Sequence, residues 1–173
     1  MLSDGRELTG TSGAGISSVT IHLLIEQQVA RTPDAIALVF RKIRLTFAEL
    51  DLRANRFAHM LRAHGVGRGT LVALYMERSA DAVAALLGVL KAGAAYLPLD
   101  ASFPPERVAA IVADAGAALV LAGSAQAAAL PNALPVIFDC PGQPGKAPPP
   151  CNTSDDLALV LCTSGSTDRK SVV

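Results

Sequence analysis

The sequence has no excess of charge of either sign, since Lys and Arg together number 15 and so do Asp and Glu. No basic stripe is therefore available to hold a nucleic acid or an anionic membrane. The first residues lack a basic region followed by an apolar one, and charged residues interrupt the apolar stretches well short of membrane-spanning length. We expect a cytoplasmic protein that binds neither nucleic acid nor membrane.

Cysteine is also scarce. The three thiols, Cys140, Cys151 and Cys162, form no CxxC pair and have no histidine close to them in sequence. This pattern argues against a disulfide framework and against a zinc site, and it predicts reduced thiols. The three histidines are expected on helices, as satisfied surface or core residues rather than as ligands: His22, His59 and His64.

What the sequence does have is apolar content, 51% of 173 residues, which is enough for one compact unit. Residues 1–15 are rich in Gly, Ser and Thr without hydrophobic periodicity, so we predict a flexible linker there. Strands are expected at 35–40, 43–46, 71–75, 95–99, 118–122, 136–138 and 157–162, the first two as a hairpin. Helices are expected at 16–31, after 46, at 79–91, from 104, and at 124–130. This alternation predicts an α/β fold with a mostly parallel sheet and helices on both faces.

Several residues mark the ends of these elements. Thr46 and Glu49 have the spacing of a capping box, and Ser79 is placed to cap the next helix. Gly93 is expected to end that helix in the left-handed conformation. For the helix after Thr46, an inward stripe and a solvent face are predicted: inward Leu50, Ala54, Phe57, Ala58 and Leu61, outward Arg53, Arg56 and Arg62. The proline-rich stretch 141–150 is expected to be a surface loop or extended connector.

The candidate site lies near the end of the chain. Residues 157–162 form an unbroken apolar run of the length of a buried parallel strand. The run leads directly into a hydroxyl-rich loop: Thr163, Ser164, Gly165, Ser166 and Thr167. Four hydroxyls and the N–H groups of a tight turn make a cage of donors suited to phosphate oxygens, and the glycine allows a close backbone approach. Parallel sheets bind ligands beyond the carboxyl ends of their strands, so we predict a phosphate loop, although the composition also fits a plain surface loop.

Two other phosphate-binding motifs are absent. No GxxxxGK[ST] sequence occurs, and the glycines at 65, 67 and 69 do not have GxGxxG spacing. P-loop NTPases and Rossmann dehydrogenases are therefore set aside.

Three stretches resemble core motifs of the adenylate-forming enzymes, the AMP-dependent synthetases and ligases. Residues 45–50, LTFAEL, are similar to the first motif; residues 90–100, LKAGAAYLPLD, closely resemble the second; and 163–167, TSGST, match the phosphate loop. With NRFAHMLRAHGV and VALYMERS between them, the resemblance is strongest to the adenylation domains of nonribosomal peptide synthetases. It extends from about Val19 to Thr167. We interpret the first two motifs as scaffold and only the third as a ligand contact.

The family pattern stops after Thr167. Asp168, Lys170, Ser171 and Val172 stand where the family has Gly, Pro, Lys and Gly. The expected organisation is a flexible linker at 1–15, the N-terminal part of a truncated AMP-binding adenylation domain at 16–167, and an atypical tail at 168–173. The fold implied by the resemblance is the N-terminal portion of the large subdomain of an adenylate-forming enzyme.

The resemblance implies a parent enzyme that activates an amino acid with ATP and Mg²⁺ to an aminoacyl-AMP, then loads it on a carrier-bound phosphopantetheine. Its implied partners are the amino acid, ATP, and the carrier and condensation domains of an assembly line. Residues 163–167 would hold the β- and γ-phosphates. No catalytic residue and no metal ligand can be assigned in this chain, which alone is expected to be inactive. The alternatives are an acyl-CoA ligase fragment of the same family, a non-enzymatic α/β scaffold or interaction module, or a small nucleotide-binding protein.

Overall fold

The computed structural model describes residues 19–131, 136–137, 145–162 and 171–172. At its centre is a parallel sheet in the order β4 (Ala95–Pro98), β3 (Leu71–Tyr75), β5 (Leu119–Ala122), β6 (Val136–Ile137). In the register of this sheet, Val72 of β3 is the partner of Tyr96 on one side and Leu119 on the other. The predicted mostly parallel sheet is therefore confirmed.

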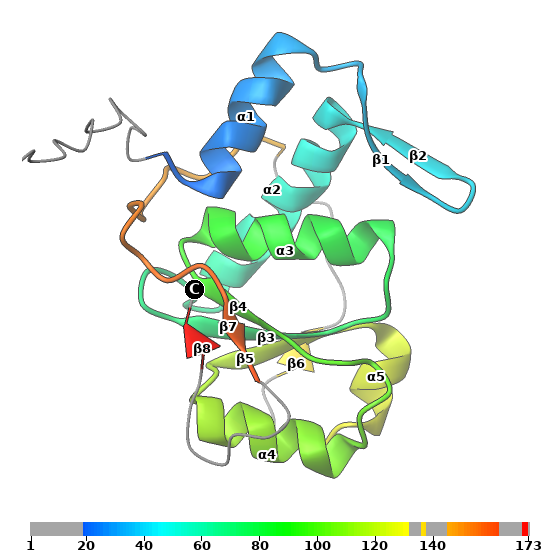
Figure 1. Cartoon of the computed structure of the whole chain (residues 1–173), viewed down its shortest axis with the longest axis vertical. Coiled ribbons are helices and arrows are strands. Elements are labelled where there is room, and N and C mark those ends of the chain that lie inside the picture. The colour runs from blue at the N-terminus through cyan, green and yellow to red at the C-terminus, as the bar shows by residue number, and fades with distance from the viewer. Residues whose placement is uncertain (1–18, 132–135, 138–144, 163–170, 173) are drawn as a thin grey trace, which may run out of the picture.

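Helices cover both faces of the sheet (Figure 1). On one face lie α2 (Phe47–Ala63) and α3 (Ala80–Ala92), with α1 (Ile21–Arg31) packed outside them; on the other lie α4 (Pro105–Ala115) and α5 (Ser124–Ala129). Alternate residues of β3 serve the two cores, because successive side chains of a strand point to opposite faces. Val72 packs with α2 and α3, and Ala73 packs toward α4. This arrangement is the three-layered architecture expected from the sequence.

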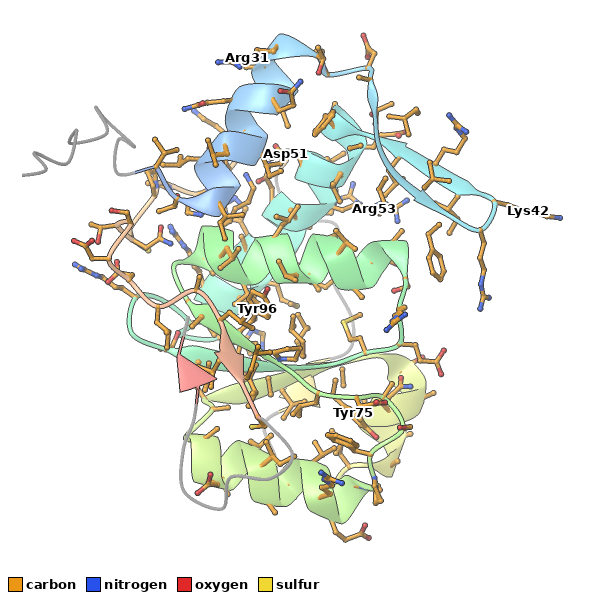
Figure 2. The ribbon with its side chains drawn as sticks, viewed as in Figure 1. Arg31, Lys42, Asp51, Arg53, Tyr75 and Tyr96 are labelled. Carbon is orange, nitrogen blue, oxygen red and sulfur yellow. The ribbon has the colours of Figure 1, made fainter. Side chains whose placement is uncertain are left out.

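The first two strands stand apart from the sheet as a hairpin. Strands β1 (Ile36–Phe40) and β2 (Ile43–Thr46) pair antiparallel, with Arg41 in the left-handed region at φ 54°. Lys42 points away from the body at the tip (Figure 2). The predicted hairpin is confirmed.

Three predicted helix ends are also confirmed. The Thr46 hydroxyl accepts from Glu49 N at 3.2 Å while the Glu49 carboxylate accepts from Thr46 N at 2.9 Å, a complete capping box. The Ser79 hydroxyl accepts from Ala82 N at 3.0 Å at the start of α3. Gly93 ends α3 with φ 97°. Local hydrogen bonding thus fixes where α2 and α3 begin, and a glycine fixes where α3 ends.

The first helix is shorter than predicted. It was expected from residue 16, whereas α1 begins at Ile21 and residues 16–18 lie outside the described part. Thr20 has extended backbone at φ −75° and ψ 156°, so it precedes the helix as its N-cap. Helical spacing of apolar residues does not show where such an extended residue falls.

The strand expected over 157–162 is shorter and more exposed than predicted. Only β7 (Val160–Leu161) forms, together with a parallel bridge between Leu159 and Tyr96 of β4. Its other partner is antiparallel, β8 (Ser171–Val172). Val160 is buried, but Leu161 is 37% exposed. The prediction of a strand buried on both faces was wrong because this segment lies outside β4, at the edge of the sheet.

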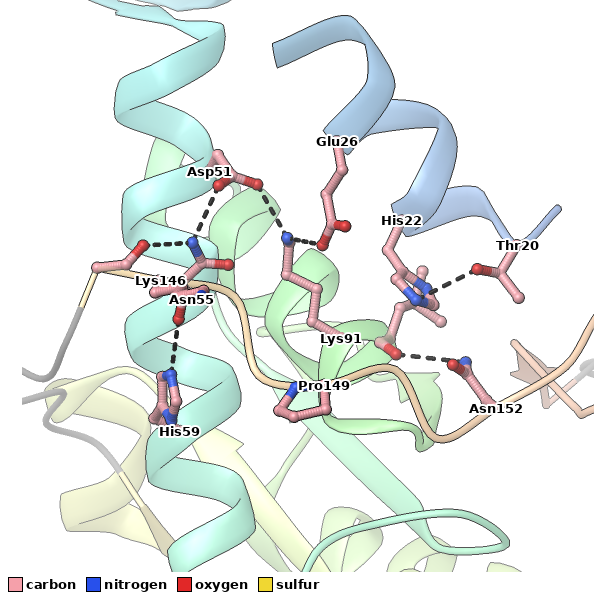
Figure 3. A network of polar contacts seen from close by, with 12 residues as sticks. Thr20, His22, Glu26, Asp51, Asn55, His59, Lys91, Lys146, Pro149 and Asn152 are labelled. Carbon is pink, nitrogen blue, oxygen red and sulfur yellow. Dashed lines mark hydrogen bonds and ion pairs between the residues drawn. The ribbon is translucent and has the colours of Figure 1, made fainter. Parts of the chain in front are cut away.

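A buried cation joins the three helices of one layer (Figure 3). The Lys91 side chain from α3 is 1% exposed, and its ammonium pairs with Glu26 of α1 and, at 2.9 Å, with Asp51 of α2. The second Asp51 oxygen accepts from Asn55 Nδ2 at 2.9 Å. Two carboxylates and one ammonium therefore hold α1 and α2 to α3.

The predicted solvent face of α2 needs one correction. Arg62 was expected to face solvent, but its guanidinium donates to the carbonyls of Lys91 and Ala92 at 3.2 and 3.3 Å. The last carbonyls of a helix have no partner within the helix, and Arg62 satisfies two of them at the end of α3. Arg53 and Arg56 are half-buried.

The three histidines lie on or beside helices, as predicted, but they differ in their surroundings. His59 donates to the Lys146 carbonyl at 2.8 Å and His64 to the Met60 carbonyl at 2.9 Å, so both are satisfied. His22 is 2% exposed; its Nε2 lies 3.2 Å from the Thr20 hydroxyl, and its Nδ1 has no hydrogen-bond partner in the described part of the chain. Burial lowers the pKa of His22, partly against the pull of the Glu26 carboxylate.

Candidate functional site

The carboxyl ends of the parallel strands meet at one edge of the sheet. There β3 ends at Tyr75, β4 at Pro98 and β5 at Ala122. Because the bridge to Tyr96 is parallel, β7 runs toward the same edge and ends there at Leu161. The five residues predicted to bind phosphate, 163–167, lie outside the described residues. What the structure locates is the strand that leads into them, beside the end of β4.

A hollow of about 580 Å³ opens at the ends of β3 and β5. Its charged groups are largely paired, since Arg53 donates to Asp81 at 2.7 Å and the Gln126 amide approaches Glu77 at 3.5 Å. Arg56 also lines it, and its buried Nε has no hydrogen-bond partner among the described residues. The hollow therefore offers a mixed wall of cations, carboxylates and amide groups.

A second hollow, of about 850 Å³, lies between the hairpin tip and the ends of β3 and β4. Asp100 on its wall accepts from the backbone N and the hydroxyl of Ser102, at 2.9 and 2.7 Å. These bonds, chiefly the backbone one, hold the pKa of Asp100 below its usual value, so the side chain is a carboxylate at neutral pH. The buried Tyr75 hydroxyl donates to the Phe103 carbonyl at 2.8 Å and fixes the loop that follows β4.

The described residues form no obvious metal centre. No group of three or more His, Cys, Asp or Glu among them could hold a metal ion. Of the described cysteines, Cys151 and Cys162 are free, and Cys140 falls outside that part. No helix in the described ranges is long and apolar enough to cross a bilayer.

Sequence reasoning missed most of the residues on this edge. Arg53 and Arg56 were assigned to a solvent face, and Glu77 and Gln126 were assigned nothing. Asp100 was the last residue of the LKAGAAYLPLD stretch, which was interpreted as scaffold. The motif was the only signal available, because side chains from distant helices and loops meet at a sheet edge only after folding.

The family model for AMP-binding enzymes matches residues 25–170. The chain belongs to the AMP-binding enzyme family. Tyrocidine synthase 3 of Brevibacillus parabrevis is 44% identical over 161 residues, which is 87% of this chain and 2% of that protein. Zwittermicin A synthase ZmaJ of Bacillus cereus is 40% identical over 157 residues, covering 88% of this chain and 30% of that one.

Solved structures agree with these relatives. The nonribosomal peptide synthetase FmoA3 in its AMPPNP-bound form superposes with a TM-score of 0.82 at 37% identity, over 87% of this chain and 17% of that chain. The NpsA N-terminal subdomain of Klebsiella oxytoca superposes with a TM-score of 0.76 at 26% identity, over 90% of this chain and 41% of that chain. This member of the AMP-binding family thus has the sequence and fold of the N-terminal part of a nonribosomal peptide synthetase adenylation domain, and it spans a small part of its relatives.

Proposed function

We propose that this chain supplies the first part of an adenylation domain that activates an amino acid with ATP, forming an aminoacyl-AMP and pyrophosphate. The observation that carries the proposal is the continuous family match over residues 25–170, which includes the whole described sheet up to β7. FmoA3, which is 37% identical over 84% of this chain, has been solved with α-methyl-L-serine-AMP bound. A bound aminoacyl-AMP is the product expected of this reaction.

In this proposal Thr163, Ser164, Gly165, Ser166 and Thr167 hold the β- and γ-phosphates of ATP. Support comes from the course of β7, which reaches the carboxyl edge of the sheet directly before these residues. Their hydroxyl and N–H groups would position the triphosphate and offset its charge, and no described residue is assigned to Mg²⁺.

The remaining partners follow from the same assignment. The aminoacyl group would pass to the thiol of a phosphopantetheine arm on a carrier domain, beside a condensation domain, in the cytoplasm. No observation on this chain favours an acyl-CoA ligase over an amino-acid-activating enzyme.

A chimera tests the proposal. Residues 25–167 of this chain replace the matching segment of FmoA3, and pyrophosphate exchange into ATP is measured with α-methyl-L-serine. We expect exchange that depends on the amino acid, and we expect Ser164→Ala in the same chimera to reduce it. A folded chimera that binds α-methyl-L-serine-AMP but catalyses no exchange would contradict the proposal.

A further inference from the structure

A proline-rich segment lies across α2 and the end of α3, and its contacts are made mainly through its backbone. We call residues 145–152 the strap. The carbonyls of Gly145 and Lys146 accept from Asn55 Nδ2 at 2.6 Å and His59 Nε2 at 2.8 Å (Figure 3). The Pro149 carbonyl accepts from Arg62 Nη2 at 2.6 Å. Residues 55, 59 and 62 lie on one face of a helix, so α2 presents a row of three donors to three carbonyls.

The α2 side chains supply hydrogen-bond donors, and the backbone of the strap supplies the acceptors. Prolines have no N–H group, so a proline-rich backbone offers carbonyls and little else. Such a segment is also stiff, and it loses little entropy when it is bound. All three α2 side chains act as donors, and the carbonyl that Arg62 contacts belongs to a proline. Pro148 is buried between the contact points at Lys146 and Pro149.

The strap also touches side chains near both of its ends. A Cβ at Gly145 would meet the tip of the exposed Leu52 side chain of α2, which would have to move aside. At the other end Cys151 Sγ occupies the space that a side chain on Gly93 would need, and it lies 3.3 Å from the Arg62 guanidinium. Contacts at Gly145 and Cys151 therefore add to the three hydrogen bonds between the strap and α2.

The strap leads without interruption into β7. At the turn that follows it, Asp156 accepts from Thr153 N at 2.7 Å and from Arg68 at 2.9 Å. Two residues later the Ala158 carbonyl accepts from Tyr96 N of β4 at 3.0 Å. The strand itself has only two residues, so its own ladder holds it weakly, and contacts made earlier in the chain add to its attachment.

We propose that Asn55, His59 and Arg62 are positioning residues. By holding the strap through its carbonyls they fix β7 against β4, and so they set the point from which residues 163–167 begin. The inference rests on the proposed function for the role of those five residues. The docking of β7 by the α2 donor row can be tested without it.

Amide hydrogen exchange in the full chain, without nucleotide, provides the test. The Tyr96 amide, which donates to Ala158, reports on β7, and the amide of the fully buried Val120 in β5 reports on the whole fold. His59→Leu removes one donor, and we expect Tyr96 exchange to rise about fivefold, as the loss of one hydrogen bond implies. Val120 exchange should rise by no more than this, because complete unfolding breaks the same bond. His59→Gln, which keeps a donor, should restore slow exchange.

Arg53→Met is the matched control, since Arg53 is on the same helix but pairs with Asp81 away from the strap. Arg53→Met should therefore leave Tyr96 exchange unchanged, because undocking of β7 does not break the pair with Asp81. No acceleration at Tyr96 in the His59→Leu chain, or the same acceleration at Tyr96 in the Arg53→Met chain, would overturn the inference. So would equal effects of His59→Leu and His59→Gln. Because no nucleotide is used, the hydrogen-exchange results do not depend on the chimera experiment. If the chimera catalyses no pyrophosphate exchange while the hydrogen-exchange results support the docking of β7, only the proposed function is rejected.

Discussion

The ammonium of Lys91 lies 2.9 Å from Asp51 Oδ1 although the Lys91 side chain is only 1% exposed. Glu26 contacts the same ammonium from α1. One cation thus balances two carboxylates from two other helices inside the protein. Burying a charge is tolerated when it is paired, and removing one partner leaves the others in a medium that penalises them.

Lys91→Met should therefore destabilise the protein strongly. It leaves Glu26 and Asp51 close together without their cation; because their side chains are 30% and 17% exposed, the loss should stay below the roughly 3–5 kcal/mol of a fully buried pair. Urea unfolding followed by circular dichroism measures the change. Lys42→Met, at the exposed hairpin tip, is the control and should shift the free energy of unfolding by less than about 0.5 kcal/mol. Similar losses in the two variants would mean that the buried cation contributes nothing specific.

Stability should fall as the pH drops below about 6.5, because of His22. Burial lowers the pKa of His22 in the folded state from its ordinary 6.5. As the pH falls, His22 therefore binds a proton in the unfolded chain before it does so in the folded one, and this protonation stabilises the unfolded state. Asp100 and Asp156, whose pKa values lie below the ordinary 3.8, contribute only in stronger acid. Unfolding free energies between pH 7 and 5 should thus slope downward in the native chain. His22→Gln should flatten the slope; an unchanged slope in the His22→Gln chain contradicts the assignment.

Gly93→Ala should be more damaging than Gly65→Ala. Both positions have positive φ, 97° and 79°, so both substitutions strain the backbone by about 1–2 kcal/mol. At Gly65 there is open space, whereas at Gly93 the new methyl meets Cys151 Sγ. Thermal unfolding should show a larger loss at Gly93, and adding Cys151→Ala should recover the difference. If the double variant is no more stable than Gly93→Ala alone, the collision is not the cause.

Binding of Mg-ATP should be very weak, and replacing Asp168 should strengthen it. The sequence has this carboxylate directly after TSGST, where the family motif has glycine. Like charges at about 4 Å repel by about 4 kcal/mol at an effective dielectric constant of about 20, roughly a thousandfold in affinity before salt weakens it. Calorimetric titration of the native chain, of Asp168→Asn, and of a chain with Asp168→Gly, Lys170→Pro, Ser171→Lys and Val172→Gly measures this. Equal affinities in all three would show that this turn does not face phosphate.

The sequence predicted best what local chemistry decides. The capping box of Thr46 and Glu49 and the glycine at 93 are set by neighbours a few residues away, and both were located correctly. The burial of Lys91 was missed, because its partners Glu26 and Asp51 are 65 and 40 residues distant and nothing near Lys91 indicates them. The exposure of Leu161 was missed for a related reason. An apolar run looks the same in the middle of a sheet and at its edge.

The attachment of the strap to α2 also bears on the order in which the chain folds. Arg53 and Asp81, which join α2 to α3, are 28 residues apart in sequence, whereas Asn55 and the Gly145 carbonyl are 90 apart. Closing the longer loop costs about 1 kcal/mol more in chain entropy. The short strap buries little apolar surface that could offset this cost early in folding. We expect the helical layer to assemble in the folding transition state and the strap to dock afterwards. Substitutions at His59 should then speed unfolding and leave the folding rate unchanged.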